Sequence, residues 1–192
     1  NIYADLQTRM INYTFEGPEI EGNITTQTAY LNFFNPKFGL FHDLNENQSL
    51  YASFALANKE PNRNDYVEST PNSRPKHETL YDTEIGYKQK GEALSLGLNL
   101  YYMNYKNQLV LTGQINDVGA YTRTNIEKSY RQGIEIESIV KINNKINWIG
   151  NMTFSQNKIV DYVAYIDNWD TWGQETVKHQ NTDLAFSPNL IW

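Results

Sequence analysis

The sequence of 192 residues contains no cysteine. That absence excludes disulfide bonds, thiolate zinc sites and cysteine nucleophiles. Long hydrophobic runs are missing too, because no apolar stretch approaches the roughly 18 residues that a transmembrane helix requires. Acidic side chains outnumber basic ones, 22 to 16, which gives a net charge of −6. This charge argues against nucleic acid as a partner, since nucleic acids bind to basic faces.

Alanine, the best helix former, is scarce, with 9 residues in the whole chain. Asparagine is frequent, with 24 residues, and aromatic residues make up 14% of the sequence. Asparagine favours turns, whereas Tyr, Phe and Trp favour strands. Hydrophobic residues amount to 40%, which is low for a compact soluble core. The composition therefore favours an all-β chain whose sheet has one apolar and one polar face.

Alternation of apolar and polar side chains predicts the strands of this sheet. The pattern is clearest from Ala93 to Asn104, where leucines alternate with small or polar residues such as Ser95 and Asn99. A tight turn at 90–92 joins this run to a strand at 79–89, which together form a hairpin. Further strands are expected at about 2–15, 36–40, 50–56, 134–142, 146–155 and 184–192. The fold class is therefore all-β, an antiparallel meander of about eight strands.

The predicted connections alternate in length. Short turns are expected at 45–48, 91–92 and 143–144, and long polar loops near 17–28, 58–77, 107–128 and 157–183. Short turns at one rim and long loops at the other are typical of an outer-membrane β-barrel. The polar strand faces suit a wet lumen, and aromatic residues near strand ends suit interfacial girdles. A soluble β-sandwich or meander with one solvated face is the alternative interpretation of the same pattern.

Five motifs, in order over about residues 30–160, resemble TonB-dependent outer-membrane receptors of the Bacteroidetes type. They are Asn35–Leu40 with Ser49–Phe54, Lys59–Arg63, Pro75–Thr79 running into Glu84–Lys88, Leu100–Gln108, and Tyr130–Glu137. The resemblance implies that the chain belongs to the C-terminal β-barrel of such a receptor. In that family about 22 strands form a transmembrane β-barrel around an N-terminal plug domain.

The resemblance also implies a location in the bacterial outer membrane, in contact with its lipid. It implies uptake of a ferric siderophore or similar small ligand, powered through TonB. We interpret residues 1–192 as a single β-barrel segment, since the plug domain and the remaining strands are absent from this sequence. TonB and the plug domain are therefore expected as partners of the full-length receptor only, and the segment alone is not expected to transport.

Seven residues in the predicted extracellular loops are candidates for ligand binding in such a receptor. Aromatic side chains stack on a planar or catecholate ligand, and arginine attracts an anionic ferric siderophore. The candidates are Arg63, Arg74, Tyr121, Arg123, Tyr165, Trp169 and Trp172. The alternative interpretation is that the aromatic residues pack their loops together and that the arginines are simply solvated.

No catalytic motif accompanies these residues. The sequence has neither a G-x-S-x-G elbow nor a phosphate-binding glycine loop, so we expect no enzyme activity and no cofactor. The 3 histidines lack metal-binding spacing, and we expect no metal site. Glu135 and Glu137 share a strand face and are interpreted as part of a charged lumen wall. Two other functions stay open, a soluble glycan-binding β-sandwich and a small eight-stranded barrel with a structural or pore role.

Overall fold

A computed structural model describes residues 1–18, 24–69, 74–116 and 119–192. Strands form nearly all of this part of the chain. In chain order the elements are β1 (Ile2–Pro18), β2 (Ile24–Asn45), β3 (Gln48–Lys59), α1 (Arg63–Val67), β4 (Glu78–Gln89), β5 (Leu94–Ile115), β6 (Tyr121–Lys141), β7 (Asn147–Asn168), β8 (Gly173–Asp183) and β9 (Leu190–Ile191). Within the described residues, no helix is long and apolar enough to cross a membrane.

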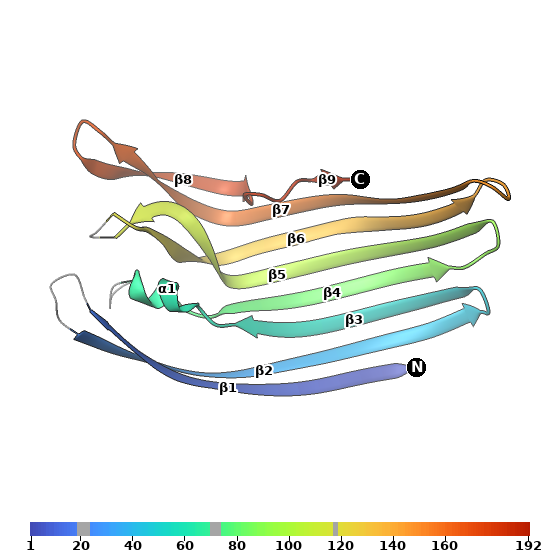
Figure 1. The fold of residues 1–192 in the computed structure, drawn as a ribbon, viewed down its shortest axis with the longest axis horizontal. Coiled ribbons are helices and arrows are strands. Elements are labelled where there is room, and N and C mark those ends of the chain that lie inside the picture. Colours follow the sequence, from blue (N-terminus) through green and yellow to red (C-terminus); the bar gives the residue numbers. More distant parts are fainter. Residues whose placement is uncertain (19–23, 70–73, 117–118) are drawn as a thin grey trace.

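The strands form one antiparallel sheet whose spatial order follows the sequence (Figure 1). Each strand from β1 to β7 pairs with the next, and β9 adds to β7 at Thr153 and Phe154. Over the described ranges β1 and β8 are the ends of this order, so the sheet is open. The predicted antiparallel meander is confirmed. Neither two packed sheets nor a closed eight-stranded barrel is formed by this part of the chain.

Two adjacent rows of cross-strand partners show how the two faces of the sheet differ. One row runs Leu40, Ala52, Ile85, Leu100, Ile134 and Phe154 across β2 to β7. The neighbouring row runs Gly39, Ser53, Glu84, Tyr101, Gly133 and Ser155. Ile85, Leu100 and Phe154 are 54%, 50% and 47% exposed. A continuous row of exposed apolar side chains is what the lipid-facing surface of the predicted barrel requires, and the polar row is the face predicted to line its lumen.

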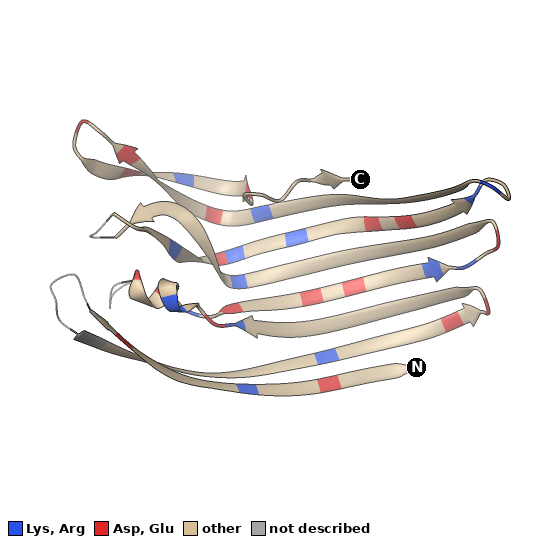
Figure 2. Ribbon diagram, viewed as in Figure 1, with Lys and Arg blue, Asp and Glu red and all other residues tan. Residues whose placement is uncertain are grey.

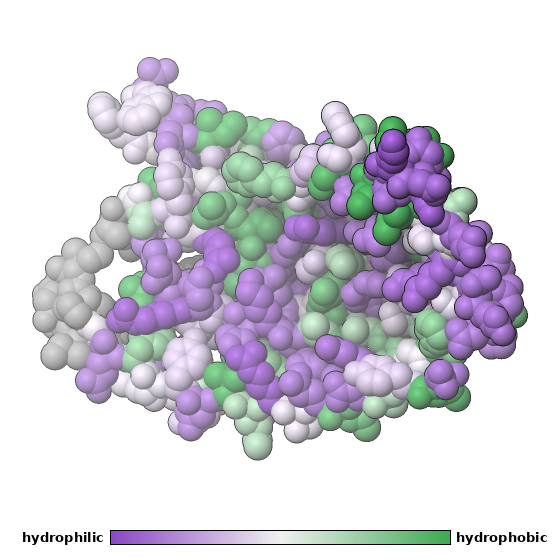
Figure 3. All heavy atoms as spheres, turned by 45° about the vertical axis from the view of Figure 1, so that its right-hand side comes forward, coloured by the Kyte–Doolittle hydropathy of each residue, from purple (hydrophilic) through white to green (hydrophobic). Residues whose placement is uncertain are grey.

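Few side chains are buried, because the sheet is a single layer over most of its length. The buried cluster of Ile126, Ile159 and Leu184 lies where β6, β7 and the segment after β8 meet. Figure 3 shows hydrophobic side chains spread among hydrophilic ones over the strands, while hydrophilic ones gather at the turn end on the right. With so small a core, the cross-strand hydrogen bonds of the ladder are the main contacts that hold this part of the chain together.

Two glycines leave room for tyrosine rings on the lumen face, because they have no side chain. A Cβ atom at Gly86 would collide with the ring of its cross-strand partner Tyr51. A Cβ atom at Gly133 would collide with the carbonyl oxygen of Phe154 and lie 2.7 Å from the hydroxyl of Tyr101, its partner on β5. Each tyrosine thus covers the backbone of a glycine on the next strand, an arrangement that stabilises sheet glycines.

The short turns lie at one end of the sheet, as predicted, between β2 and β3, β4 and β5, and β6 and β7 (Figure 1). Asparagine side chains stabilise two of them. The Oδ1 atom of Asn45 accepts the amide of Asn47 at 2.9 Å, and that of Asn143 accepts the amides of Lys145 and Ile146 at 2.8 and 3.0 Å. These bonds are Asx turns, which explains the preference for asparagine at these positions.

The opposite rim differs from the prediction, because three of the four expected long loops are mostly strand. In the region 107–128, β5 continues to Ile115 and β6 begins at Tyr121. In the region 157–183, β7 and β8 pair as far as Asn168 and Gly173. In the region 17–28, β1 and β2 pair up to Pro18 and Ile24, and residues 19–23 lie outside the described part. Ladder hydrogen bonds join backbone groups and need no strict alternation of apolar and polar side chains, so the pairing continues through these segments.

The connection between β3 and β4 is irregular, as predicted, and it contains α1; its residues 70–73 lie outside the described part. The predicted last strand at 184–192 is wrong for most of its length. Pairing resumes only at β9, because Phe186 has a left-handed φ of +57° that interrupts the extended backbone after β8.

Candidate functional site

Helix α1 lies at the rim opposite the short turns and is fixed at its first turn by a capping box. The side chain of Asn62 accepts the amide of Asp65 at 2.9 Å, and the carboxylate of Asp65 accepts the amide of Asn62 at 2.7 Å. Both bonds satisfy helix-start donors that would otherwise lack a partner. The local sequence Asn-x-x-Asp therefore marks the start of this short helix.

A bidentate ion pair joins α1 to β6. Asp65 is buried, with 3% of its side chain exposed, and its two carboxylate oxygens accept bonds from Nε and Nη2 of Arg123, both at 2.6 Å. Two parallel N–H···O bonds hold both the distance and the orientation of the two groups. Arg123 therefore positions α1 against the wall of the sheet, 58 residues away in sequence.

Aromatic packing fixes the other side of α1. Tyr66 is 3% exposed, and its ring lies 5.9 Å from that of Tyr13 and 6.1 Å from that of Phe15 on β1. The guanidinium of Arg74 lies 5.2 Å from the centre of the Tyr66 ring and donates to the carbonyl oxygen of Thr28 at 2.7 Å. Together these contacts connect α1 to β1 and β2 as well as β6.

A hollow of about 410 Å³ opens beside this helix. It is lined by Tyr30, Tyr66, Arg74, Lys76 and His77, among others. The backbone of Lys76 is fixed from both sides, because its amide donates to Asn125 at 2.7 Å and its carbonyl oxygen accepts from the same side chain at 2.9 Å. Aromatic rings and basic groups around one hollow can stack on and attract a planar anionic ligand.

The β7–β8 turn carries the most exposed aromatic pair of the rim. Trp169 and Trp172 are 73% and 85% exposed, and their rings meet edge to face with centres 6.2 Å apart. Asn168 holds the turn, since its Oδ1 atom accepts the amides of Asp170 and Thr171 at 2.9 and 3.2 Å. Two large rings are therefore presented to solvent on a defined turn.

A glutamine side chain ties this turn to the neighbouring β5–β6 hairpin. Gln174 donates to the carbonyl oxygen of Gly113 at 2.8 Å and accepts the amide of Ile115 at 3.2 Å. Gly113 has a φ of +82°, and a Cβ atom there would collide with the carbonyl oxygen of Tyr165. The two hairpin tips therefore form one connected surface.

The seven predicted site residues divide into three groups in the structure. Arg74 and Arg123 are held in contacts that fix α1. Arg63 in α1, Tyr121 at the start of β6, and Trp169 and Trp172 are exposed, whereas Tyr165 is partly covered within β7. Three predicted loop residues, Tyr121, Arg123 and Tyr165, thus lie on strands. The prediction missed Asp65 and Tyr66, for which the capping motif was the available sequence signal.

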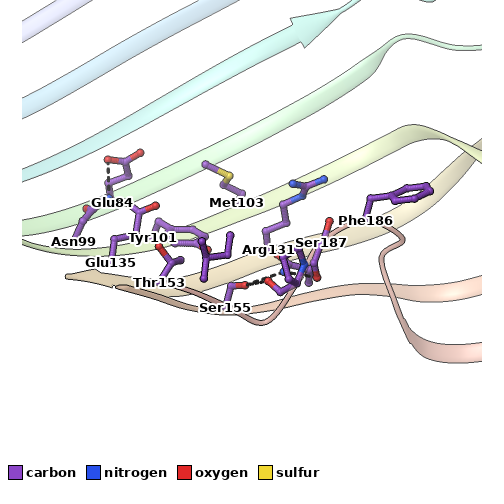
Figure 4. Close-up of a pocket in the computed structure, with 13 residues that line it drawn as sticks. Glu84, Asn99, Tyr101, Met103, Arg131, Glu135, Thr153, Ser155, Phe186 and Ser187 are labelled. Atoms are coloured by element: carbon purple, nitrogen blue, oxygen red, sulfur yellow. Dashed lines mark hydrogen bonds between the residues drawn. The ribbon is translucent and has the colours of Figure 1, made fainter. Parts of the chain in front are cut away.

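The lumen face has its own polar site, shown in Figure 4. Asn99 donates to Glu84 at 3.4 Å and to Glu135 at 3.2 Å, and it accepts from the hydroxyl of Tyr51 at 2.9 Å. Arg131 lies beside these groups and faces the ring of Tyr105 at 5.8 Å. A hollow of about 350 Å³ separates this wall from the segment after β8.

Carboxylates predominate over much of this wall, because Asp82 and Glu137 lie on the same face as Glu84 and Glu135. The two pairs form red bands on β4 and β6 (Figure 2). Within the described ranges, no group of three or more His, Asp or Glu side chains is placed to hold a metal ion.

Residues 7–191 match the protein family described as TonB dependent receptor-like, beta-barrel. The match extends over nearly the whole chain, so the chain belongs to the family of TonB-dependent receptor-like β-barrels. The open sheet is thus a segment of an outer-membrane β-barrel. The family comprises receptors and transporters rather than enzymes. The sequence has no match among curated proteins.

Three solved structures show the same fold at low sequence identity. The siderophore receptor PiuA from Acinetobacter baumannii matches with a TM-score of 0.70 and 18% identity, over 98% of this chain and 27% of that protein. The ferric-catecholate import receptor Fiu from E. coli K12 gives 0.55 and 22%, over 82% and 26%. The copper transporter OprC gives 0.64 and 15%, over 82% and 26%. The chain spans about a quarter of these proteins.

Proposed function

We propose that the chain is part of an outer-membrane receptor for TonB-dependent uptake of a ferric siderophore or a similar small chelate. The observation that carries the proposal is the exposed Trp169–Trp172 pair at the rim opposite the short turns. Family membership supports the receptor class, and two of the three compared structures are siderophore or ferric-catecholate receptors. The third is a copper transporter, so the fold alone does not select the cargo.

Capture of the ligand is passive in this proposal. The tryptophan rings stack on the planar groups of the chelate, and the cationic groups of Arg63 and Lys76 attract its negative charge. Arg74 and Arg123 act indirectly, because they hold α1 and the hollow beside it in place. The chain's own residues supply binding and framing, and we infer no catalytic role for them.

The full-length receptor is the right material for testing this proposal, with binding of a ferric catecholate chelate measured by fluorescence titration. We expect Trp169→Ala with Trp172→Ala to weaken binding about tenfold or more, since each ring contributes about 0.5–1.5 kcal/mol beyond its area. The matched control, Trp169→Phe with Trp172→Phe, keeps an aromatic face at both positions and should bind within a few-fold of the native receptor. Equal affinity of the alanine variant and the native receptor would contradict the proposal.

The plug domain and the remaining barrel strands are proposed to belong to the rest of the receptor. The acidic lumen wall supports this part of the proposal, because Glu84 and Glu135 form no ion pair with any of the described residues. A plug with basic groups facing Glu84 and Glu135 would neutralise the wall. TonB would then act on the plug, as the family resemblance implies.

The plug contact has its own test. In the full-length receptor, Glu84→Gln with Glu135→Gln should lower the urea concentration at which the plug unfolds, while the barrel transition stays unchanged. The control with the same charge change is Glu46→Gln with Glu92→Gln, because both residues are exposed in the short turns. An unchanged plug transition in the lumen variant would refute the contact.

A further inference from the structure

Two lysines lie directly opposite each other on the lipid side of the sheet. Lys106 on β5 is the cross-strand partner of Lys128 on β6, and both side chains are exposed. Tyr102 and Lys106 lie on the same face of β5, whereas Tyr105 between them turns inward to face Arg131. In Figure 2 the pair forms neighbouring blue bands on β5 and β6.

The height of this pair places it at the outer membrane boundary. The outward apolar run of β5 starts at Leu94 beside a short turn and ends at Tyr102. A tilted strand crosses the hydrocarbon in about 9–11 residues, so Lys106 lies just beyond the outer end of the crossing. The rings of Tyr102 and Tyr130 meet there, 6.3 Å apart, as expected of an interfacial aromatic belt.

Neither lysine is neutralised by the protein. Among the described residues, Lys106 and Lys128 form no ion pair, and neither does Glu127, which precedes Lys128. Lys158, the outward cation of the next strand, pairs with Asp183 at 2.7 Å. Like charges directly opposite on a sheet are destabilising. Asp183 compensates the charge of Lys158, whereas no acidic side chain among the described residues forms an ion pair with Lys106 or Lys128.

We propose that Lys106 and Lys128 bind the phosphate group of an outer-leaflet glycolipid. A phosphate between the two ammonium groups removes their repulsion and accepts their hydrogen bonds. The lipid's acyl chains would lie against the apolar outward row, with the Tyr102–Tyr130 rings at the level of the headgroup. The inference rests on the outer-membrane location and is independent of the cargo.

Native mass spectrometry of the full-length receptor in neutral detergent tests the proposal. The probes are bis-phosphorylated lipid A, the same lipid after enzymatic dephosphorylation, and inorganic phosphate. We expect the phosphorylated lipid to bind best, and Lys106→Gln with Lys128→Gln to weaken it about thirtyfold, or about fivefold for each lysine. Lys106→Arg with Lys128→Arg should retain binding, which shows that charge at these positions is what matters.

The matched control is Lys90→Gln with Lys145→Gln, which makes the same charge change in two short turns at the opposite rim and should leave lipid binding unchanged. Equal loss in this control, or no loss in the Lys106 and Lys128 variant, overturns the proposal. Equal affinity for the dephosphorylated lipid also overturns it, because the acyl chains would then account for binding. Inorganic phosphate that binds as tightly as the lipid would assign the pair to free phosphate instead.

A charge reversal gives a second, independent readout. Lys128→Glu creates a cross-strand ion pair with Lys106 and removes the phosphate site. We expect its unfolding temperature to rise relative to the native receptor in neutral detergent, and phosphorylated lipid to stabilise the native receptor but not the variant. Equal stabilisation of both proteins by the phosphorylated lipid would contradict the proposal.

Discussion

The ion pair between Asp65 and Arg123 should control how firmly α1 is docked. Arg123→Leu would leave the buried carboxylate of Asp65 with the amide of Asn62 as its remaining hydrogen-bond donor. Removing one partner of a buried pair costs about 3–5 kcal/mol. Arg123 is 28% exposed on its side chain, so solvent reaches the site and the lower end of that range applies. We therefore expect docking of α1 to weaken by about 3 kcal/mol.

Hydrogen exchange of the full-length receptor measures this effect, because 3 kcal/mol corresponds to roughly a hundredfold faster exchange of the α1 amides. Exchange in β4 and β5 should not change, since their ladders do not depend on the helix. Asp65→Asn in the Arg123→Leu background removes the orphan charge and should recover part of the protection. This recovery distinguishes a buried unpaired carboxylate from a general loss of packing.

Arg74→Leu is the matched control for the arginine, because Arg74 is itself exposed and contacts α1 through the buried ring of Tyr66. Such a contact contributes about 0.5–1 kcal/mol, so exchange should accelerate only a few-fold. The reasoning is refuted if Arg123→Leu leaves the α1 amides as protected as before, or if Arg74→Leu exposes them to the same extent.

Three other predictions concern the wall and the rim. Gly86→Ala should destabilise the barrel by about 1–3 kcal/mol, because the added methyl group collides with the ring of Tyr51. The barrel should then lose its folded mobility on gels at a lower temperature. Adding Tyr51→Ala to this variant should restore part of the lost stability. Gly133→Ala should be worse than Gly86→Ala, because its Cβ atom meets the backbone carbonyl oxygen of Phe154 in addition to the movable ring of Tyr101; equal temperatures for both variants would contradict this. Asn168→Ala removes the bonds that hold the Trp169–Trp172 turn, so chelate affinity should fall while barrel stability stays the same, and an unchanged affinity would show that the turn geometry is irrelevant.

The membrane-crossing part of the sheet was predictable because one face must be apolar there. Leu94 to Tyr102 and Ile134 to Val140 alternate in step with the pleat, and the structure pairs them in register. Beyond the hydrocarbon this constraint ends. In β5 between Gln108 and Ile115, Leu109 is buried and the next residue, Val110, packs against the Ile126–Ile159–Leu184 cluster, so apolar and polar side chains do not alternate strictly although the backbone continues the ladder.

The candidate site was only partly predictable for a related reason. Exposed tryptophans in a turn are visible in the sequence, and Trp169 and Trp172 lie where solvent reaches them. The role of Arg123 depends on which residue faces it across 58 positions of sequence, and that is set by strand register rather than by local pattern. Helix α1 is too short for a hydrophobic period, so only its capping residues Asn62 and Asp65 indicate it.

The central claim is that alternate residues of each strand face lipid and lumen. Spin labels at single introduced cysteines from Leu96 to Met103 on β5, in the full-length receptor in a bilayer, test it most directly. The chain has no cysteine of its own to interfere. We expect collisions with oxygen to peak at Leu96, Leu98 and Leu100, and collisions with a water-soluble nickel complex to peak at Gly97, Asn99 and Tyr101. Oxygen collisions that peak at Gly97, Asn99 and Tyr101 instead would contradict the assignment of the two faces. Equal accessibility of neighbouring positions would also contradict it.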